Sequence, residues 1–129
     1  LLAEAENERM HLMIFIEIAK PNWFERWMII LAQALFWHFY LVLYIFFPSC
    51  AHRMVGYFEE QAVISYTDYL KQIDNGKTKN IPAPKIAIGY YGLRKTATLR
   101  DVVLAVRQDE RGHAKVNHEM ADEVRREKN

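Results

Sequence analysis

The chain has 129 residues, which suits one domain of ordinary size, and its formal charge of +1 is close to neutral. Hydrophobic residues make up 51% of the chain and aromatic residues 13%, a composition that excludes a disordered polymer. The balanced charge gives no electrostatic basis for binding nucleic acid. The single cysteine, Cys50, excludes an internal disulfide framework and any metal site built from several cysteines.

Two long helices are predicted in the first part of the chain. Residues 1–19 contain no Gly or Pro and are rich in helix-forming residues. Pro21 ends this run, because proline lacks a backbone donor and restricts the residue before it. Residues 23–47 form the second helix, and beyond its first turn only Gln33 and His38 are clearly polar. The segment therefore has the length and composition of a membrane span.

The second part of the chain predicts two more helices separated by a loop. Residues 50–73 form a helix that ends at a turn signal around Gly76, and residues 75–97 form a polar, proline-containing loop. Thr98 is a suitable N-cap for a final helix that runs to about residue 125. The charged tail, residues 126–129, is expected to fray. The chain is therefore predicted to be all-α.

Two Glu-x-x-His motifs lie on the first and last predicted helices. Glu8 precedes His11 by three residues, and Glu110 precedes His113 by the same spacing. Three residues is close to one helical turn, so each pair shares a face and is able to ligate one metal. With this Glu content, two such pairs arise by chance about 6% of the time, so ordinary solvated helix faces remain an alternative. Two such helices, with a Glu from each of two others, build di-iron sites in ferritin-like bundles, and these ligands suit iron or manganese.

The third predicted helix supplies another carboxylate. Glu59 lies among apolar residues, and a buried carboxylate is costly unless it is paired or bound to metal. Tyr66 shares its helix face two turns further on. The alternatives are an exposed Glu59 and an ordinary core tyrosine. Because the only Glu in residues 23–47 is Glu25, at the start, we expect the remaining bundle ligand upstream of Leu1, in an N-terminally truncated fragment.

The apolar segment and the metal site constrain each other. If residues 23–47 crossed the bilayer, Glu8 and Glu59 would lie on opposite sides of a hydrocarbon core of about 30 Å. They would then be unable to share a cluster. Either the segment lies along one leaflet or the metal site is absent, and hydropathy alone favours a span.

Three stretches and one short pattern closely resemble the alternative oxidase family. They are AENERMHL (5–12), HRMVGYFEEQAVISYT (52–67), TLRDVVLAVRQDERGHAKVNHEMAD (98–122), and Pro21, Trp23 and Arg26 in the spacing P-x-W-x-x-R. The resemblance implies that residues 1–129 are a single, partial di-iron oxidase domain. Its fold would be a ferritin-like four-helix bundle that lacks its first ligand helix and carries a membrane-interfacial amphipathic helix at 23–47.

The resemblance also implies a function. Members of the family are cyanide-insensitive oxidases that transfer electrons from ubiquinol to O₂, forming water without pumping protons at two non-haem iron ions. They are homodimers bound to one membrane leaflet, on the matrix side of the mitochondrial inner membrane or at the bacterial cytoplasmic membrane. We expect no nucleic-acid partner. We also expect no activity from this fragment alone, since only five of the six metal ligands are present.

Residue roles follow from the family's motifs. The implied metal ligands are Glu8, His11, Glu59, Glu110 and His113, and the implied catalytic tyrosine is Tyr66. The residues implied to orient the ligands through hydrogen bonds are Asn7, Arg9, His52 and Asp109. The implied quinol-binding residues are Phe58, Gln61, Ala62 and Ser65.

The chain departs from the family in three places. Gln61 stands where the family usually has Glu, Arg111-Gly112 where it often has Ala-His, and Tyr91 where Trp is usual. Gln61 bears on quinol binding and not on the ligand set. A plastid-type terminal quinol oxidase and a non-enzymatic membrane-surface protein with incidental Glu-x-x-His pairs remain alternatives, and iron content separates the second from an oxidase. A membrane desaturase is disfavoured because the five histidines are scattered.

Overall fold

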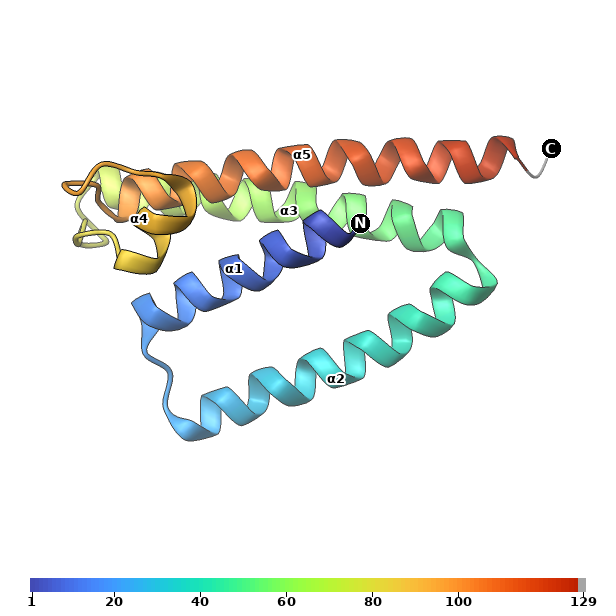
Figure 1. Ribbon diagram of the computed structural model, residues 1–129, viewed down its shortest axis with the longest axis horizontal. Coiled ribbons are helices and arrows are strands. Elements are labelled where there is room, and N and C mark those ends of the chain that lie inside the picture. Colours follow the sequence, from blue (N-terminus) through green and yellow to red (C-terminus); the bar gives the residue numbers. More distant parts are fainter. Residues whose placement is uncertain (128–129) are drawn as a thin grey trace. The chain divides into compact units, whose positions relative to one another are not determined.

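The computed structural model describes residues 1–127, which form five helices and no strand (Figure 1). The helices are α1 (Leu2–Ala19), α2 (Trp23–Phe46), α3 (Pro48–Asp74), α4 (Lys85–Tyr91) and α5 (Leu99–Arg126). The all-α prediction is confirmed. Helix α5 reaches Arg126, and the last two residues of the predicted frayed tail lie outside the described part of the chain.

Local sequence explains where the helices begin and end. Helix α1 ends at Ala19 and is capped by Lys20, whose backbone is left-handed (φ 48°), immediately before Pro21. Asn22 then caps α2 in a reciprocal box: its side-chain oxygen accepts from the Glu25 backbone N–H, and the Glu25 carboxylate accepts from the Asn22 N–H. Helix α3 begins at Pro48, where the missing N–H costs no helical hydrogen bond.

Helix α4 lies inside residues 75–97, which the sequence predicts as a loop. Its Ala87 is fully buried, and the neighbouring Ile86 and Ile88 pack against a buried cluster. Gly92 ends the helix in a left-handed conformation (φ 61°) that suits glycine. A helix of seven residues is too short to be stable alone, so tertiary packing and not a long periodic pattern stabilises it.

The structure divides into two compact units, and the first comprises residues 1–20 and 61–111. It holds α1, α4, the second half of α3 and the first half of α5. One buried cluster includes Ile14 of α1 with Val102 and Val106 of α5. A second joins Leu70 and Ile73 of α3 to Val103 of α5. These clusters hold α1 and α3 against the same stretch of α5.

The second unit comprises residues 21–60 and the described residues from 112 onward. Here α2 runs antiparallel to α3, since Phe36 contacts Phe58 (ring centroids 6.1 Å apart) and Tyr44 contacts His52 (5.4 Å). No residue of α2 is buried, although the helix is long and apolar enough to cross a membrane. Its large apolar side chains are therefore exposed, as on surfaces that contact lipid or another protein.

Candidate metal centre

In the first unit, two carboxylates converge on one buried imidazole. His11 is 4% exposed, and its Nδ1 lies 3.4 Å from Glu8 Oε1 and 3.2 Å from Glu110 Oε1. Carboxylate oxygens of Glu8 and Glu110 lie within 4.8 Å of one another. The glutamates of the two Glu-x-x-His motifs, one on α1 and one on α5, thus both lie beside Nδ1 of His11.

This arrangement is electrostatically demanding because Glu110 is also buried, at 3% exposure. Two neighbouring carboxylates repel each other unless a positive charge lies beside them. Burial alone would lower the pKa of His11, but hydrogen bonds to Glu110, Glu8 and Asp109 raise it to about 10. The neighbouring carboxylates therefore favour the protonated form of the imidazole.

The other ring nitrogen of His11 belongs to a hydrogen-bond network around Asp109. His11 Nε2 lies 3.1 Å from Asp109 Oδ2 and 3.0 Å from the Tyr91 hydroxyl. The Tyr91 hydroxyl donates to Asp109 (2.6 Å), and Asn7 Nδ2 donates to Asp109 (3.0 Å) and to the Tyr90 hydroxyl (2.8 Å). These contacts fix the imidazole plane, as hydrogen-bond partners of metal ligands do.

The same network shifts the acidities of its members. Burial raises the pKa of Asp109, but donation from Tyr91, Asn7 and His11 outweighs burial and lowers it. Burial and the Asp109 carboxylate both raise the pKa of Tyr91. Asp109 is therefore a charged acceptor and Tyr91 a neutral donor near neutral pH.

In the second unit, Glu59 of α3 and His113 of α5 form a further pair. Their ligand atoms lie within 4.8 Å of one another. Glu59 is half-buried, and the Nδ1 atom of His113 is buried. His52, 3% exposed, lies with its Nδ1 3.2 Å from Asn117 Oδ1. Asn117 in turn donates to the His113 carbonyl at 3.0 Å, so His52 and Asn117 brace α3 against α5 one turn beyond His113.

Some predicted site residues lie apart from these groups. Arg9 is exposed and forms an ion pair with Glu6 one turn away, at 2.7 Å. It makes no described contact with the Asp109 network. Tyr66 stacks on Phe15 (ring centroids 5.7 Å apart) and packs against both buried clusters of the first unit. The network around Asp109 thus includes Asn7, whereas the described ion pair of Arg9 is with Glu6.

Sequence reasoning missed Tyr90 and the hydrogen-bonding role of Tyr91. Tyr91 lies 80 residues from His11 in the chain, so no local pattern connects the two. The departure at Tyr91 from the family's usual Trp was the only available signal. Trp and Tyr side chains both carry a hydrogen-bond donor, an N–H or an O–H, on a large aromatic ring.

The predicted quinol-binding residues share one face of α3, with the spacing of successive helical turns. Phe58, Gln61 and Ser65 are exposed, and Ala62 is half-buried. Phe58 contacts Phe36 of α2, so this exposed apolar helix adjoins the face at one end.

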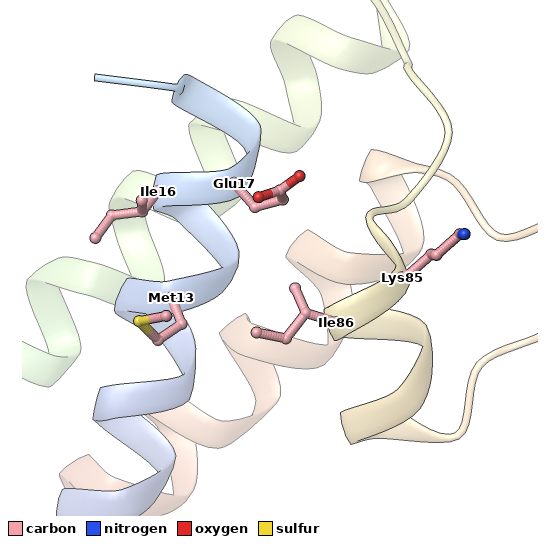
Figure 2. Close-up of a pocket in the computed structure, with 5 residues that line it drawn as sticks. All are labelled: Met13, Ile16, Glu17, Lys85 and Ile86. Carbon is pink, nitrogen blue, oxygen red and sulfur yellow. The ribbon is translucent and has the colours of Figure 1, made fainter. Parts of the chain in front are cut away.

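A separate cavity of about 370 Å³ lies between α1 and α4 in the first unit (Figure 2). It is lined by Met13, Ile16, Glu17, Lys85 and Ile86. Figure 2 shows Met13, Ile16 and Glu17 on α1 and Ile86 on α4, with the Lys85 side chain extending away from them. None of the predicted quinol-binding residues lines it, so this cavity is distinct from the predicted quinol site.

The donor sets of both units fit iron. Carboxylate oxygens with imidazole nitrogen are the ligands of non-haem iron and manganese, whereas soft thiolates are absent from both groups. Clustering of Glu8 and Glu110 around a buried imidazole is also the arrangement that a cation stabilises.

Comparison with known proteins gives consistent matches. A family profile described as Alternative oxidase matches residues 1–122. The chain is 57% identical over 122 residues to "Ubiquinol oxidase 1c, mitochondrial" of Arabidopsis thaliana, covering 95% of this chain and 37% of that protein. It is 58% identical over 118 residues to "Ubiquinol oxidase 2, mitochondrial" of Nicotiana tabacum, covering 92% and 40% respectively. A ubiquinol oxidase of Batrachochytrium dendrobatidis is 53% identical over 124 residues, covering 96% and 39%. The chain thus spans about two fifths of the length of these relatives.

Proposed function

The chain belongs to the alternative oxidase family, and we propose that it carries the metal centre of a terminal oxidase that passes electrons from ubiquinol to O₂ without pumping protons. The observation that carries this proposal is the convergence of Glu8 and Glu110 on His11. Relatives at 53–58% identity are named ubiquinol oxidases, which supports ubiquinol as the substrate.

The proposed centre holds two iron ions. Its ligands are Glu8, His11 and Glu110 together with the pair Glu59 and His113. Glu110 and His113 lie one turn apart on α5, so this helix contributes one residue to each group.

The network around Asp109 prepares His11 for metal. When Nε2–H donates to the charged Asp109, the Nδ1 lone pair is directed toward Glu8 and Glu110. Tyr91 and Asn7 keep Asp109 charged by donating to it. Bound iron would supply the redox chemistry, while the protein supplies orientation and excludes water. Tyr66, on the Glu59 face of α3, is the side chain that we assign to proton or electron exchange with the centre.

Quinol would reach the protein laterally from the membrane. Phe58, which adjoins α2, offers an apolar surface for the quinone ring, and Ala62 leaves room beside it. Gln61 and Ser65 offer neutral hydrogen-bonding groups to quinol hydroxyls. The amide of Gln61 replaces the usual carboxylate, so it would position the quinol without accepting its proton.

The proposed membrane contact involves one leaflet. Helix α3, which runs beside α2, carries His52, Glu59 and Glu60 along its length. Carrying these groups into the hydrocarbon core would be costly, whereas an α2 that lies along the interface leaves them outside it. By family membership and the names of its relatives, we assign the protein to the matrix side of the mitochondrial inner membrane, as a homodimer. The bacterial cytoplasmic membrane is the equivalent location.

Oxygen uptake by membranes tests the proposal. The protein at its natural length would be expressed in a host without a cyanide-resistant oxidase, and ubiquinol-dependent O₂ uptake would be measured in cyanide. We expect uptake that Glu59→Ala abolishes, because the mutation removes a ligand. Glu119→Ala is the matched control, since Glu119 is an exposed glutamate of α5 whose described ion pair is with Lys115. An iron-loaded, folded protein without uptake would contradict the oxidase assignment. Faster uptake with plastoquinol than with ubiquinol would favour the plastid-type alternative.

A further inference from the structure

Beyond the ligands, one imidazole connects α5 to three residues of α3. His118 Nδ1 lies 2.9 Å from Arg53 Nη1, and its Nε2 lies 3.2 Å from Glu60 Oε1. Its ring meets Tyr57 edge-on, with centroids 5.0 Å apart. Positions 53, 57 and 60 lie on one face of a helix, so the imidazole spans two turns of α3.

A single neutral tautomer satisfies both hydrogen bonds. Arg53 has only donors, so Nδ1 of His118 must accept from it. Nε2–H is then free to donate to the Glu60 carboxylate. Arg53 also pairs with Asp122, one turn beyond His118 on α5, so the guanidinium is itself tied to α5. His118 and Asp122 of α5 thus both bind Arg53 of α3, and His118 also binds Glu60.

Gly56 provides the space for this ring. A Cβ atom added at Gly56 would lie 2.6–2.8 Å from three atoms of the His118 imidazole. Side-chain atoms do not approach each other that closely, so the ring packs directly on the α3 backbone. Any larger residue at position 56 would displace His118.

This contact lies beside the pair Glu59 and His113, within the same unit. Glu60 follows Glu59 directly, and His118 is five residues beyond His113 on α5. The ligand atoms of the pair lie within 4.8 Å, which is less than the 5.4 Å rise of one helical turn. A small sliding or rotation of α3 against α5 would therefore separate them.

We propose that His118 is a positioning residue. Packed on Gly56 and hydrogen-bonded to Arg53 and Glu60, it fixes the register of α3 against α5 and so holds Glu59 and His113 close enough to bind one metal ion. The proposal rests on the proposed function only in taking that pair as ligands. His118 itself touches no metal in this scheme.

Anaerobic Fe²⁺ binding to the protein at its natural length tests the proposal. The variant His118→Phe keeps a ring but loses both hydrogen bonds, and Gly56→Ala displaces the ring without removing a polar group. We expect each to weaken Fe²⁺ affinity by about tenfold or more, the size of effect seen when partners of metal ligands are removed. His118→Gln, which accepts and donates in the same directions, should recover part of the affinity. Lys115→Ala, an exposed α5 control, should bind as the unaltered chain does.

The readouts separate positioning from folding. Helical circular dichroism and the melting temperature without metal report the fold, whereas the spectrum of bound Fe²⁺ reports ligand geometry. A folded His118→Phe with unaltered Fe²⁺ affinity and spectrum overturns the proposal while leaving the iron centre intact. An unaltered chain that binds no Fe²⁺ overturns the proposed centre and this proposal together. If His118→Phe does not fold, Arg53→Met removes one of the two bonds and leaves the ring on Gly56, and unchanged affinity there also overturns it.

Discussion

At the scale of single residues, Asp109 organises the polar interior of the first unit. It accepts from Asn7 of α1 and Tyr91 of α4, and it lies on α5 beside Glu110. Three helices thus meet at one carboxylate, which also lies 3.1 Å from His11 Nε2. The orientation of a predicted metal ligand therefore depends on residues far away in the sequence.

Substitutions of Tyr91 test whether the orientation of His11 depends on the hydrogen bonds to Asp109. Tyr91→Phe removes a donor to Asp109 and is expected to reduce iron affinity or activity about tenfold, because the partner that orients His11 is weakened. Tyr91→Trp replaces the hydroxyl with an indole N–H and is expected to retain most of the activity. Iron content and ubiquinol-dependent oxygen uptake would be measured for both. Equal loss in the two variants would show that the ring shape, and not donation to Asp109, matters.

At the residue scale, only the geometry that spacing within one helix determines could be predicted from the sequence. One helical turn separates Glu from His in each Glu-x-x-His motif, so the sequence alone indicates that the two side chains share a helix face. Contacts between helices could not be predicted from the sequence, because no local pattern specifies which side chain of α4 contacts His11. Arg9 illustrates the limit: it shares a helix with Glu8, yet its described ion pair is with Glu6, on the neighbouring turn.

At the scale of elements, helix boundaries were largely predictable because prolines, caps and turn signals act locally. The Asn22 and Glu25 capping box is a sequence signature that went unused, although α2 begins where proposed. Helix α4 was not predicted, because its stability comes from burying Ala87 and its neighbours and not from its short, glycine-containing sequence. Hydropathy identified α2 but did not give its orientation in a membrane.

Cysteine labelling tests the orientation of α2. Cys50 is exposed, is the only cysteine and lies just beyond the end of α2. In sealed vesicles, a membrane-impermeant maleimide should label Cys50 and, in a Cys50→Ser background, Ala19→Cys from the same side. The reason is that an α2 lying along the interface keeps both ends on one face of the bilayer. Labelling from opposite sides would show that α2 spans the bilayer, and the shared iron centre would then be excluded.

At the scale of the whole molecule, stability and metal binding are linked through His11. In the metal-free chain the pKa of His11 is raised to about 10, by Glu110, Glu8 and Asp109 against the effect of burial. The Tyr91 hydroxyl also faces it. A raised histidine pKa contributes stability fully below the unfolded value near 6.5, and this contribution is lost as the pH rises to about 10.

The free energy of unfolding of the metal-free chain is therefore expected to fall between about pH 6.5 and pH 10. The slope from His11 is at most about 1.4 kcal/mol per pH unit. Metal binding needs the neutral imidazole, so Fe²⁺ should stabilise the chain more as the pH rises. Denaturant titrations at several pH values, compared with His11→Gln, measure the slope. If the free energy of unfolding changes with pH equally in the unaltered chain and in His11→Gln, His11 is not the cause of the pH dependence.

We propose that Glu8, His11, Glu59, Glu110 and His113 hold two iron ions in one centre. The most direct test is iron content together with parallel-mode electron paramagnetic resonance of the reduced protein at its natural length. We predict two irons per chain and an integer-spin signal from coupled ferrous ions, both lost in Glu59→Ala and unchanged in Glu119→Ala. One isolated iron, or two irons that do not interact, would contradict a coupled di-iron centre.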